Sequence, residues 1–198
     1  MGADTGQPHS MTRKDQTSRA LFVTGAVGSG KSTVLDHLGD LLEEAGAPFT
    51  LVDLDWLHRT WPPPPDDPQQ SRLELANLQS LVTNVLAAQG DRPAPSGSEH
   101  SFVLAGVLVD DDQRAAVTHA LARPMTVVRL EVEPDQLERQ LRTRYTDPDR
   151  RRHLGWHLGV AAAMEERLRA SSVADHVVPV AGRSPRQVAS AVLATAGW

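Results

Sequence analysis

A glycine-rich segment near the start of the chain carries the residues with the clearest chemistry. Residues 25–32 read Gly-Ala-Val-Gly-Ser-Gly-Lys-Ser and fit the pattern G-x-x-x-x-G-K-[ST] of a phosphate-binding P-loop. The glycines let the backbone curl so that its N–H groups point at phosphate oxygens, and the helix that follows adds its positive end. Lys31 would reach the β- and γ-phosphates, and the Ser32 hydroxyl would bind Mg²⁺. The residues predicted to bind ATP in this loop are Gly25, Ala26, Val27, Gly28, Ser29, Gly30, Lys31, Ser32 and Thr33.

Lysine is rare in this chain, which makes its placement informative. The sequence has two lysines, and Lys14 lies in the polar N-terminal stretch, so Lys31 is the only lysine of the expected folded body. A guanine-specific Asn-Lys-x-Asp motif therefore cannot be formed. The nucleotide that the sequence favours is ATP rather than GTP.

A pair of carboxylates follows the second apolar run. Residues 49–54 predict a strand, and Asp53 and Asp55 stand at its C-terminal end, where open α/β sheets bind ligands. Strand alternation would place both on the same side, near the mouth of the P-loop. Such a pair suits Mg²⁺ binding by one carboxylate and orientation or deprotonation of a substrate hydroxyl by the other. We predict the metal role for Asp53 and the acceptor role for Asp55; the alternative is a solvated pair at a strand end.

Aromatic and basic side chains come directly after these carboxylates. Trp56, His58, Arg59 and Trp61 lead into a run of prolines that excludes helix and sheet interior. Such side chains beside a carboxylate pair indicate the wall of a small-molecule pocket, with Asp53, Asp55, Trp56 and Arg59 as substrate-binding residues. The alternative is that both tryptophans are hydrophobic plugs beneath the proline loop.

A cluster of arginines follows the fourth apolar run. Six arginines lie between positions 139 and 152, around a Tyr-Thr-Asp-Pro-Asp turn. Arginine supplies fixed charge and bidentate donors, so residues 134–153 suit a lid that closes over nucleotide phosphates. Arg139 and Arg142 are the predicted catalytic arginines of this lid. The alternative is a solvated basic helix.

Two further patterns have structural explanations. Val107–Asp110 could end a strand at a metal-binding aspartate, but Asp110–Asp112 also suit a helix N-terminus, and we favour that capping interpretation. His153 and His157 are four residues apart, a metal-ligand spacing, yet no other ligand completes the motif. We expect both to be surface or packing histidines.

The composition limits the class of protein. The chain has 198 residues, 40% of them hydrophobic, a net charge of −5 and no cysteine. One domain is expected, disulfides and thiolate metal sites are excluded, and an acidic balance argues against a nucleic-acid-binding surface. No apolar run approaches the ~18 residues of a membrane span, and no signal-peptide pattern is present. A cytoplasmic location without membrane contact follows by default.

The apolar runs alternate between strand and helix patterns. Strands are expected at 21–24, 49–54, 102–109, 125–132 and 176–180. Helices are expected to begin at 31, 71, 113, 134, 154 and 185, and residues 1–19 to form a disordered tail. This alternation predicts a three-layer αβα domain over residues 20–198, with a five-stranded parallel sheet.

Taken together, these segments resemble the small P-loop kinases, a group that includes adenylylsulfate kinase, shikimate kinase, gluconate kinase and chloramphenicol phosphotransferase. The resemblance extends to Leu104–Val107 and to the closing stretch 175–185. Within this group, the chain more specifically resembles actinobacterial proteins described as adenylylsulfate kinase-like. It implies the fold of a P-loop NTPase with an arginine-rich lid, MgATP as donor, and a hydroxyl acceptor near Asp55. It also implies that adenine lies between a lid arginine, here Arg139, and the loop at Arg183 and Pro185.

The sequence departs from these enzymes at their substrate motifs. Ala105-Gly106 replaces the glycine triplet of shikimate kinase, and Arg59 stands in a context unlike that of adenylylsulfate kinase. Their substrates therefore do not transfer to this chain. The expected function is ATP-dependent phosphorylation of a hydroxyl on a metabolite, nucleoside, nucleotide or antibiotic-like molecule by a monomer or homodimer. The alternatives are a regulatory ATPase without a small-molecule acceptor and a nucleoside monophosphate kinase.

Overall fold

The computed structural model describes residues 19–89, 99–145, 147 and 154–198. The predicted N-terminal tail, most of the predicted loop at 90–100 and the C-terminal part of the predicted lid, with Arg150, Arg151 and Arg152, lie outside these residues.

Five parallel strands form one sheet in the order β2-β3-β1-β4-β5, as the alternating pattern predicted. The strands are β1 (Ala20–Thr24), β2 (Phe49–Asp53), β3 (Ser101–Gly106), β4 (Met125–Glu131) and β5 (His176–Pro179). The central strand β1 is buried throughout, with Leu21 and Val23 in one hydrophobic cluster and Phe22 in the other. Because successive side chains point to opposite faces and both faces are covered, this strand reads as a continuous apolar run.

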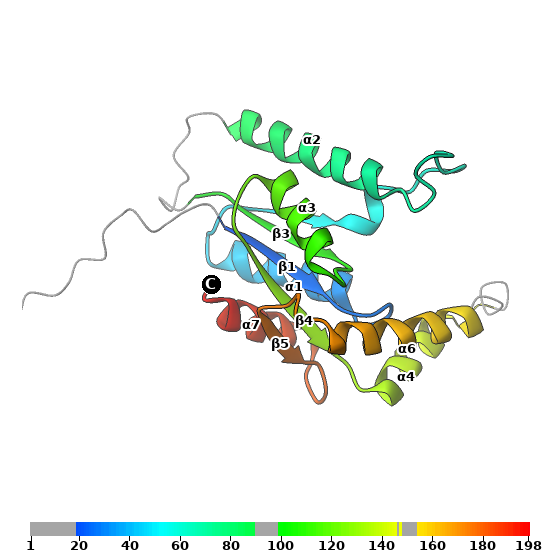
Figure 1. Ribbon diagram of the computed structural model, residues 1–198. Helices are drawn as coiled ribbons and strands as arrows, with labels where there is room; N and C mark the ends of the chain where they lie inside the picture. The colour runs from blue at the N-terminus through cyan, green and yellow to red at the C-terminus, as the bar shows by residue number, and fades with distance from the viewer. Residues whose placement is uncertain (1–18, 90–98, 146, 148–153) are drawn as a thin grey trace, which may run out of the picture.

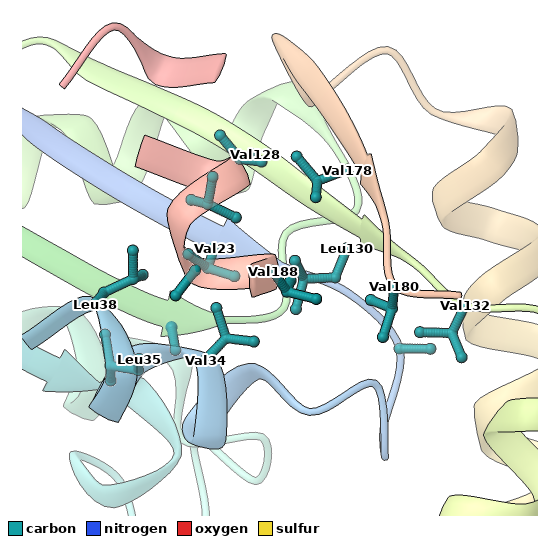
Figure 2. Packing of buried hydrophobic residues seen from close by; sticks show 14 of the residues in the cluster. Val23, Val34, Leu35, Leu38, Val128, Leu130, Val132, Val178, Val180 and Val188 are labelled. Atoms are coloured by element: carbon teal, nitrogen blue, oxygen red, sulfur yellow. The ribbon is translucent and has the colours of Figure 1, made fainter. Parts of the chain in front are cut away.

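Helices cover both faces of the sheet, which completes the three layers (Figure 1). Helices α1 (Lys31–Glu44) and α7 (Pro185–Ala196) pack on one face, and α2 (Ser71–Gln89) and α3 (Asp111–Leu121) on the other. Figure 2 shows the first of these interfaces, in which Val34 and Val188 approach Val23 of β1.

Two further helices follow β4 and pack on each other. They are α4 (Pro134–Arg144) and α6 (Leu154–Ala170), and they lie together at the C-terminal end of β4 (Figure 1). The first of them begins the predicted lid. Its buried residues are Leu137 and Leu141, which belong to the same hydrophobic cluster as α1 and α7.

The third strand is shorter than its apolar run predicted. It ends at Gly106 rather than Val109, because its neighbours end there: Gly106 pairs with Thr24, the last residue of β1, and Ala105 with Asp53, the last of β2. Beyond this point the backbone turns, and the Leu108 N–H donates to Thr24 Oγ1 at 3.0 Å. A strand continues only where a neighbouring strand offers backbone hydrogen bonds, and the hydropathy of the sequence does not show where the neighbouring strands end.

The aspartates after β3 serve the following helix. Asp110 is the N-cap of α3, and its carboxylate accepts a hydrogen bond from the Gln113 N–H at 2.8 Å. The capping interpretation is therefore confirmed, and the helix begins two residues earlier than the apolar spacing predicted, at Asp111.

Candidate functional site

The P-loop connects β1 to α1 by a turn that only glycine makes without strain. Gly28 and Gly30 have φ angles of 86° and 91°, in the left-handed region. Gly30 is the N-cap of α1, so the free N–H groups of the first helical turn face the loop. The Lys31 ammonium lies back along the loop and donates to the carbonyl oxygens of Gly25 and Ala26, at 2.9 and 3.0 Å. The local geometry is that of an anion-binding turn with a cation held at its centre.

The electrostatic surroundings of Lys31 identify its neighbours. Burial lowers the pKa of Lys31, while Asp55 and then Asp53 oppose this shift and Arg144 adds to it. The charges that act on Lys31 thus include both predicted carboxylates and one lid arginine. The P-loop and the end of β2 lie together at one edge of the sheet, where Ser32 contacts Asp53.

The two predicted metal-binding residues are in direct contact. The Ser32 hydroxyl donates to Asp53 Oδ2 at 2.6 Å, and Asp53 Oδ1 accepts the Asp55 N–H at 3.1 Å. Hydroxyl and carboxylate oxygens are the ligands that Mg²⁺ prefers in phosphate sites. In the same loop, Ser29 Oγ is buried and has no hydrogen-bond partner among the described residues, so the loop retains an unsatisfied polar group. These residues fit a site for MgATP.

Asp55 reaches the site by a route that differs from the prediction. The strand ends at Asp53, and Asp55 lies in a short 3-10 helix, η1 (Leu54–Trp56). Strand alternation therefore does not place the two carboxylates, and that argument was wrong. The turn is fixed instead by the Asp53 side chain, which caps η1 through its bond to the Asp55 N–H. Asp55 remains exposed, and its charge opposes the lowering of the Lys31 pKa by burial.

A second carboxylate stands near Asp55 and was not selected from the sequence. Glu74, in α2, is paired with His58, with His58 Nδ1 and Glu74 Oε2 2.6 Å apart. Burial raises the pKa of Glu74, His58 lowers it, and Asp55 raises it further. The acceptor side of the site thus contains two carboxylates and a histidine. Only the packing of α2 against the loop after β2 brings Glu74 there.

The two tryptophans are not plugs beneath the proline loop. Trp56 is 67% exposed and Trp61 is 91% exposed. The Arg59 guanidinium stacks on the Trp56 ring, with its carbon 4.3 Å from the ring centroid. An exposed aromatic ring covered by a planar cation lies beside Asp55 in the chain, and a pocket wall formed by these residues stays a prediction.

Arg139 and the loop before α7 line one cavity, and the adenine site that the resemblance implies there stays a prediction. A cavity of about 550 Å³ is lined by Arg139 and its neighbours in α4 and by Gly182 in that loop. Arg183 donates to the Pro179 carbonyl at 2.9 Å, and Pro185 is the first residue of α7, after the capping residue Ser184. The arrangement fits an adenine site between α4 and this loop.

The catalytic role predicted for Arg142 stays a prediction, and Arg144 is a second candidate among the described lid arginines. Arg142 is exposed and paired with Glu138, with Nη2 2.6 Å from Oε1. Arg144, at the end of α4, is the lid arginine whose charge acts on Lys31. The sequence contained one signal for Arg144, which is its position in the last helical turn before the predicted turn at 145–149. The spacing of residues along the chain gave no reason to prefer Arg144 over Arg142.

Helix α4 covers the P-loop directly. A Cβ atom built at Gly28 would lie 2.7 Å from Leu141 Cδ2, whereas one built at Gly30 would meet nothing within 4 Å. Both glycines have positive φ angles, so the two positions differ mainly in this contact.

This difference predicts unequal costs for the two alanine variants. Gly30→Ala should lower the free energy of unfolding by about 1–2 kcal/mol, the usual cost of a left-handed alanine. Gly28→Ala should cost about 1–3 kcal/mol more, because it overpacks Leu141. Urea denaturation of both variants measures the difference, and in a double-mutant cycle the cost of Gly28→Ala should be smaller in a Leu141→Ala background than in the original chain. Equal costs at the two positions would show that α4 does not press on the loop.

The predicted packing role of His157 is confirmed. Its ring stacks on Tyr145 with centroids 4.9 Å apart, and His153 lies outside the described residues. Among the described residues, no group of three or more His, Cys, Asp and Glu side chains is placed to hold a metal ion. In this same part of the chain, no helix has the length and apolarity needed to cross a membrane.

Comparisons with known proteins agree on the fold. No protein-family model matches the chain, and no curated protein sequence matches it. Among solved structures, the tunicamycin resistance protein of Deinococcus radiodurans has a TM-score of 0.62 at 16% identity, over 91% of this chain and 96% of that one. A gluconokinase from Sinorhizobium meliloti has 0.53 at 19% identity, over 89% and 92%. A shikimate kinase from Bacteroides thetaiotaomicron has 0.53 at 14% identity, over 90% and 98%. The chain has the fold of the small P-loop kinases, as its resemblance predicted.

Proposed function

We propose that this protein transfers the γ-phosphoryl group of ATP to a hydroxyl of a small molecule. The observation that carries the proposal is the meeting of Lys31, the Ser32–Asp53 pair and Asp55 at the C-terminal edge of one parallel sheet. A phosphate cradle, a pair of oxygen ligands and an exposed carboxylate are the parts that phosphoryl transfer to a hydroxyl requires.

Each part has a distinct role. The P-loop amides and Lys31 bind phosphate oxygens; Lys31 already forms two hydrogen bonds to the loop, which fix its ammonium in place. Ser32 and Asp53 would hold Mg²⁺, which when bound with ATP neutralises charge on the phosphate oxygens. Arg139 would contact the adenine from α4, and Arg183 and Pro185 would do so from the facing loop. Arg144 would balance phosphate charge, whereas Arg142 is already paired with Glu138.

The acceptor side supports a hydroxyl substrate of moderate polarity. Asp55 is exposed, so its carboxylate is free to accept a proton from a hydroxyl as the oxygen attacks. Trp56 with Arg59 offers a stacking surface for a ring. The solved structures similar in fold include a gluconokinase, a shikimate kinase and a tunicamycin resistance protein. We infer that the acceptor is a metabolite, a nucleoside, a nucleotide or an antibiotic-like molecule with a free hydroxyl.

A regulatory ATPase without an acceptor would not need this arrangement. An exposed carboxylate beside a stacked tryptophan and arginine has no purpose in a switch that only binds and hydrolyses ATP. The test is to incubate the protein with γ-labelled ATP and fractions of a metabolite extract. A labelled small-molecule product, absent with Asp55→Asn, would support the proposal. ATP hydrolysis that no fraction stimulates, with no labelled product, would favour the regulatory ATPase.

The lid gives a separate prediction. Arg144→Ala should lower kcat/KM for ATP by about 10–100-fold, the scale of one lost charge-assisted contact to phosphate. Arg142→Ala is the matched control, since Arg142 is exposed and already paired with Glu138. It should change kcat/KM less than about threefold, as expected for an exposed ion pair. The reverse order of effects would restore Arg142 as the catalytic arginine.

A further inference from the structure

Two side chains near the start of α2 hold the short loop that follows η1. Asn77 Nδ2 donates to the Leu57 carbonyl oxygen, with the two atoms 2.6 Å apart. In the next residue of the loop, His58 Nδ1 lies 2.6 Å from Glu74 Oε2. Positions 74 and 77 share one face of the helix, because residues three apart in a helix are neighbours on its surface. The backbone and the ring at the end of this loop are therefore both fixed by α2.

The contact with Glu74 uses one ring nitrogen of His58 and leaves the other available. A carboxylate accepts a hydrogen bond, so Nδ1 carries the proton and Nε2 keeps its lone pair. Nε2 forms no hydrogen bond with any residue that the structure describes. It is also not one of the enclosed polar atoms that lack a partner, and the side chain is 29% exposed. Nε2 is therefore accessible to a hydroxyl group that approaches from solvent.

His58 lies on the same side of this turn as Asp55. The helical conformation of η1 continues through Leu57, which has φ −78° and ψ −16° and donates its N–H to the Leu54 carbonyl oxygen at 2.9 Å. In 3-10 geometry the side chains at positions i and i+3 are eclipsed. Burial raises the pKa of Glu74 and the charge of Asp55 adds to this rise, which agrees with the placement. A carboxylate and an accessible imidazole nitrogen thus face the acceptor side together.

We propose that His58 binds a second hydroxyl group of the acceptor and that Glu74 is the positioning residue that orients it. The inference rests on the proposed kinase function. The attacking hydroxyl would donate to Asp55, and another hydroxyl of the same molecule would donate to His58 Nε2. The acceptor is therefore a polyol, with at least two hydroxyl groups. A hydrogen bond to a group that does not react strengthens binding equally before and during transfer, so it lowers KM and leaves kcat unchanged.

The orientation of His58 can be measured without ATP and without an acceptor. In ¹⁵N-histidine NMR spectra at about pH 8, where histidines are ordinarily neutral, we expect His58 to carry its proton on Nδ1. Glu74→Ala should move the proton toward Nε2, whereas Glu74→Gln keeps an oxygen that accepts and should not. The spectrum of His58→Asn identifies the His58 signals by their loss. A proton on Nε2 in the unmodified chain would overturn the role given to Glu74.

The contact with the acceptor is measured with the hydroxyl compound that the labelled-ATP screen yields. Asparagine keeps an amide near the position of Nδ1 but has no atom at Nε2, so His58→Asn should raise KM for that compound about fivefold to tenfold, the scale of one hydrogen bond. Glutamine reaches the position of Nε2, and His58→Gln should recover part of this loss. Glu74→Ala should also raise KM, with kcat and the KM for ATP within about twofold of the original.

A second carboxylate–histidine pair is the matched control. His37 Nδ1 lies 3.2 Å from Asp40 Oδ2 on α1, and Asp40→Ala removes that partner as Glu74→Ala removes the partner of His58. Asp40→Ala should leave every kinetic constant unchanged. If Glu74→Ala unfolds, His58→Asn still decides the contact, because its amide can donate to Glu74 in place of Nδ1.

Two outcomes would overturn the acceptor contact. One is a loss of kcat with unchanged KM in His58→Asn, which would assign the imidazole to proton transfer. The other is a labelled product whose acceptor has no hydroxyl besides the phosphorylated one. Failure of the kinase proposal is a different result, in which no fraction gives a labelled product, while the histidine spectra still show whether Glu74 orients His58.

Discussion

Lys31→Met is expected to reduce phosphoryl transfer by more than about 10³-fold, the upper range for loss of one preorganised electrostatic contact. The reason is that Lys31 is the cation at the centre of the P-loop, held by the carbonyls of Gly25 and Ala26. Methionine keeps a similar length and apolar stem but carries no charge. The measurement is single-turnover transfer from labelled ATP to the acceptor, with nucleotide affinity determined in parallel.

The controls for this variant separate chemistry from folding. The only other lysine is Lys14, so Lys14→Met removes a lysine from the predicted tail and should leave transfer unchanged. Burial lowers the pKa of Lys31, which means that its charged form is disfavoured in the folded state. Replacing it should therefore not unfold the protein, and its denaturation midpoint should stay near that of the unmodified chain. A folded Lys31→Met protein with ordinary activity would end the kinase proposal.

Asp55→Asn is expected to lower kcat by about 10²–10⁴-fold, the usual range for a lost general base. Asparagine keeps the shape of the side chain but neither accepts the hydroxyl proton nor carries the charge. Asp55 is exposed beside Lys31, and the hydrogen bond that shapes η1 uses its backbone N–H, which the substitution retains. Nucleotide affinity should therefore stay within about threefold of the original.

Two matched variants make this prediction specific. Asp66→Asn removes a carboxylate from the same connection between β2 and α2, where Asp66 is exposed and paired with Arg72, and it should leave kcat unchanged. Asp53→Asn should instead raise the Mg²⁺ concentration needed for half-maximal rate, because Asp53 faces Ser32. If Asp53→Asn lost turnover at saturating Mg²⁺ while Asp55→Asn did not, the two roles would be exchanged.

The parts of this protein that depend on interactions between near neighbours in the chain could be predicted from the amino-acid sequence. The P-loop was predictable because a left-handed turn demands glycine at positions such as 28 and 30, and a phosphate site demands a cation next to a helix N-terminus. The sheet was predictable because strands covered on both faces must be continuously apolar, as β1 is. The cap at Asp110 was predictable because its hydrogen-bond partner, the Gln113 N–H, is only three residues away in the chain.

Contacts between residues from distant segments could not be predicted from the sequence, because they depend on how helices and strands pack. The sequence does not show that Arg142 pairs with Glu138, or that Leu141 of the same helix packs against Gly28 of the P-loop, because both follow from how α4 folds and docks. Glu74 reaches His58 only through the packing of α2. The end of β3 at Gly106 depends on where its neighbours stop. Each of these outcomes depends on backbone or side-chain partners far away in the chain, and hydropathy and spacing describe only near neighbours.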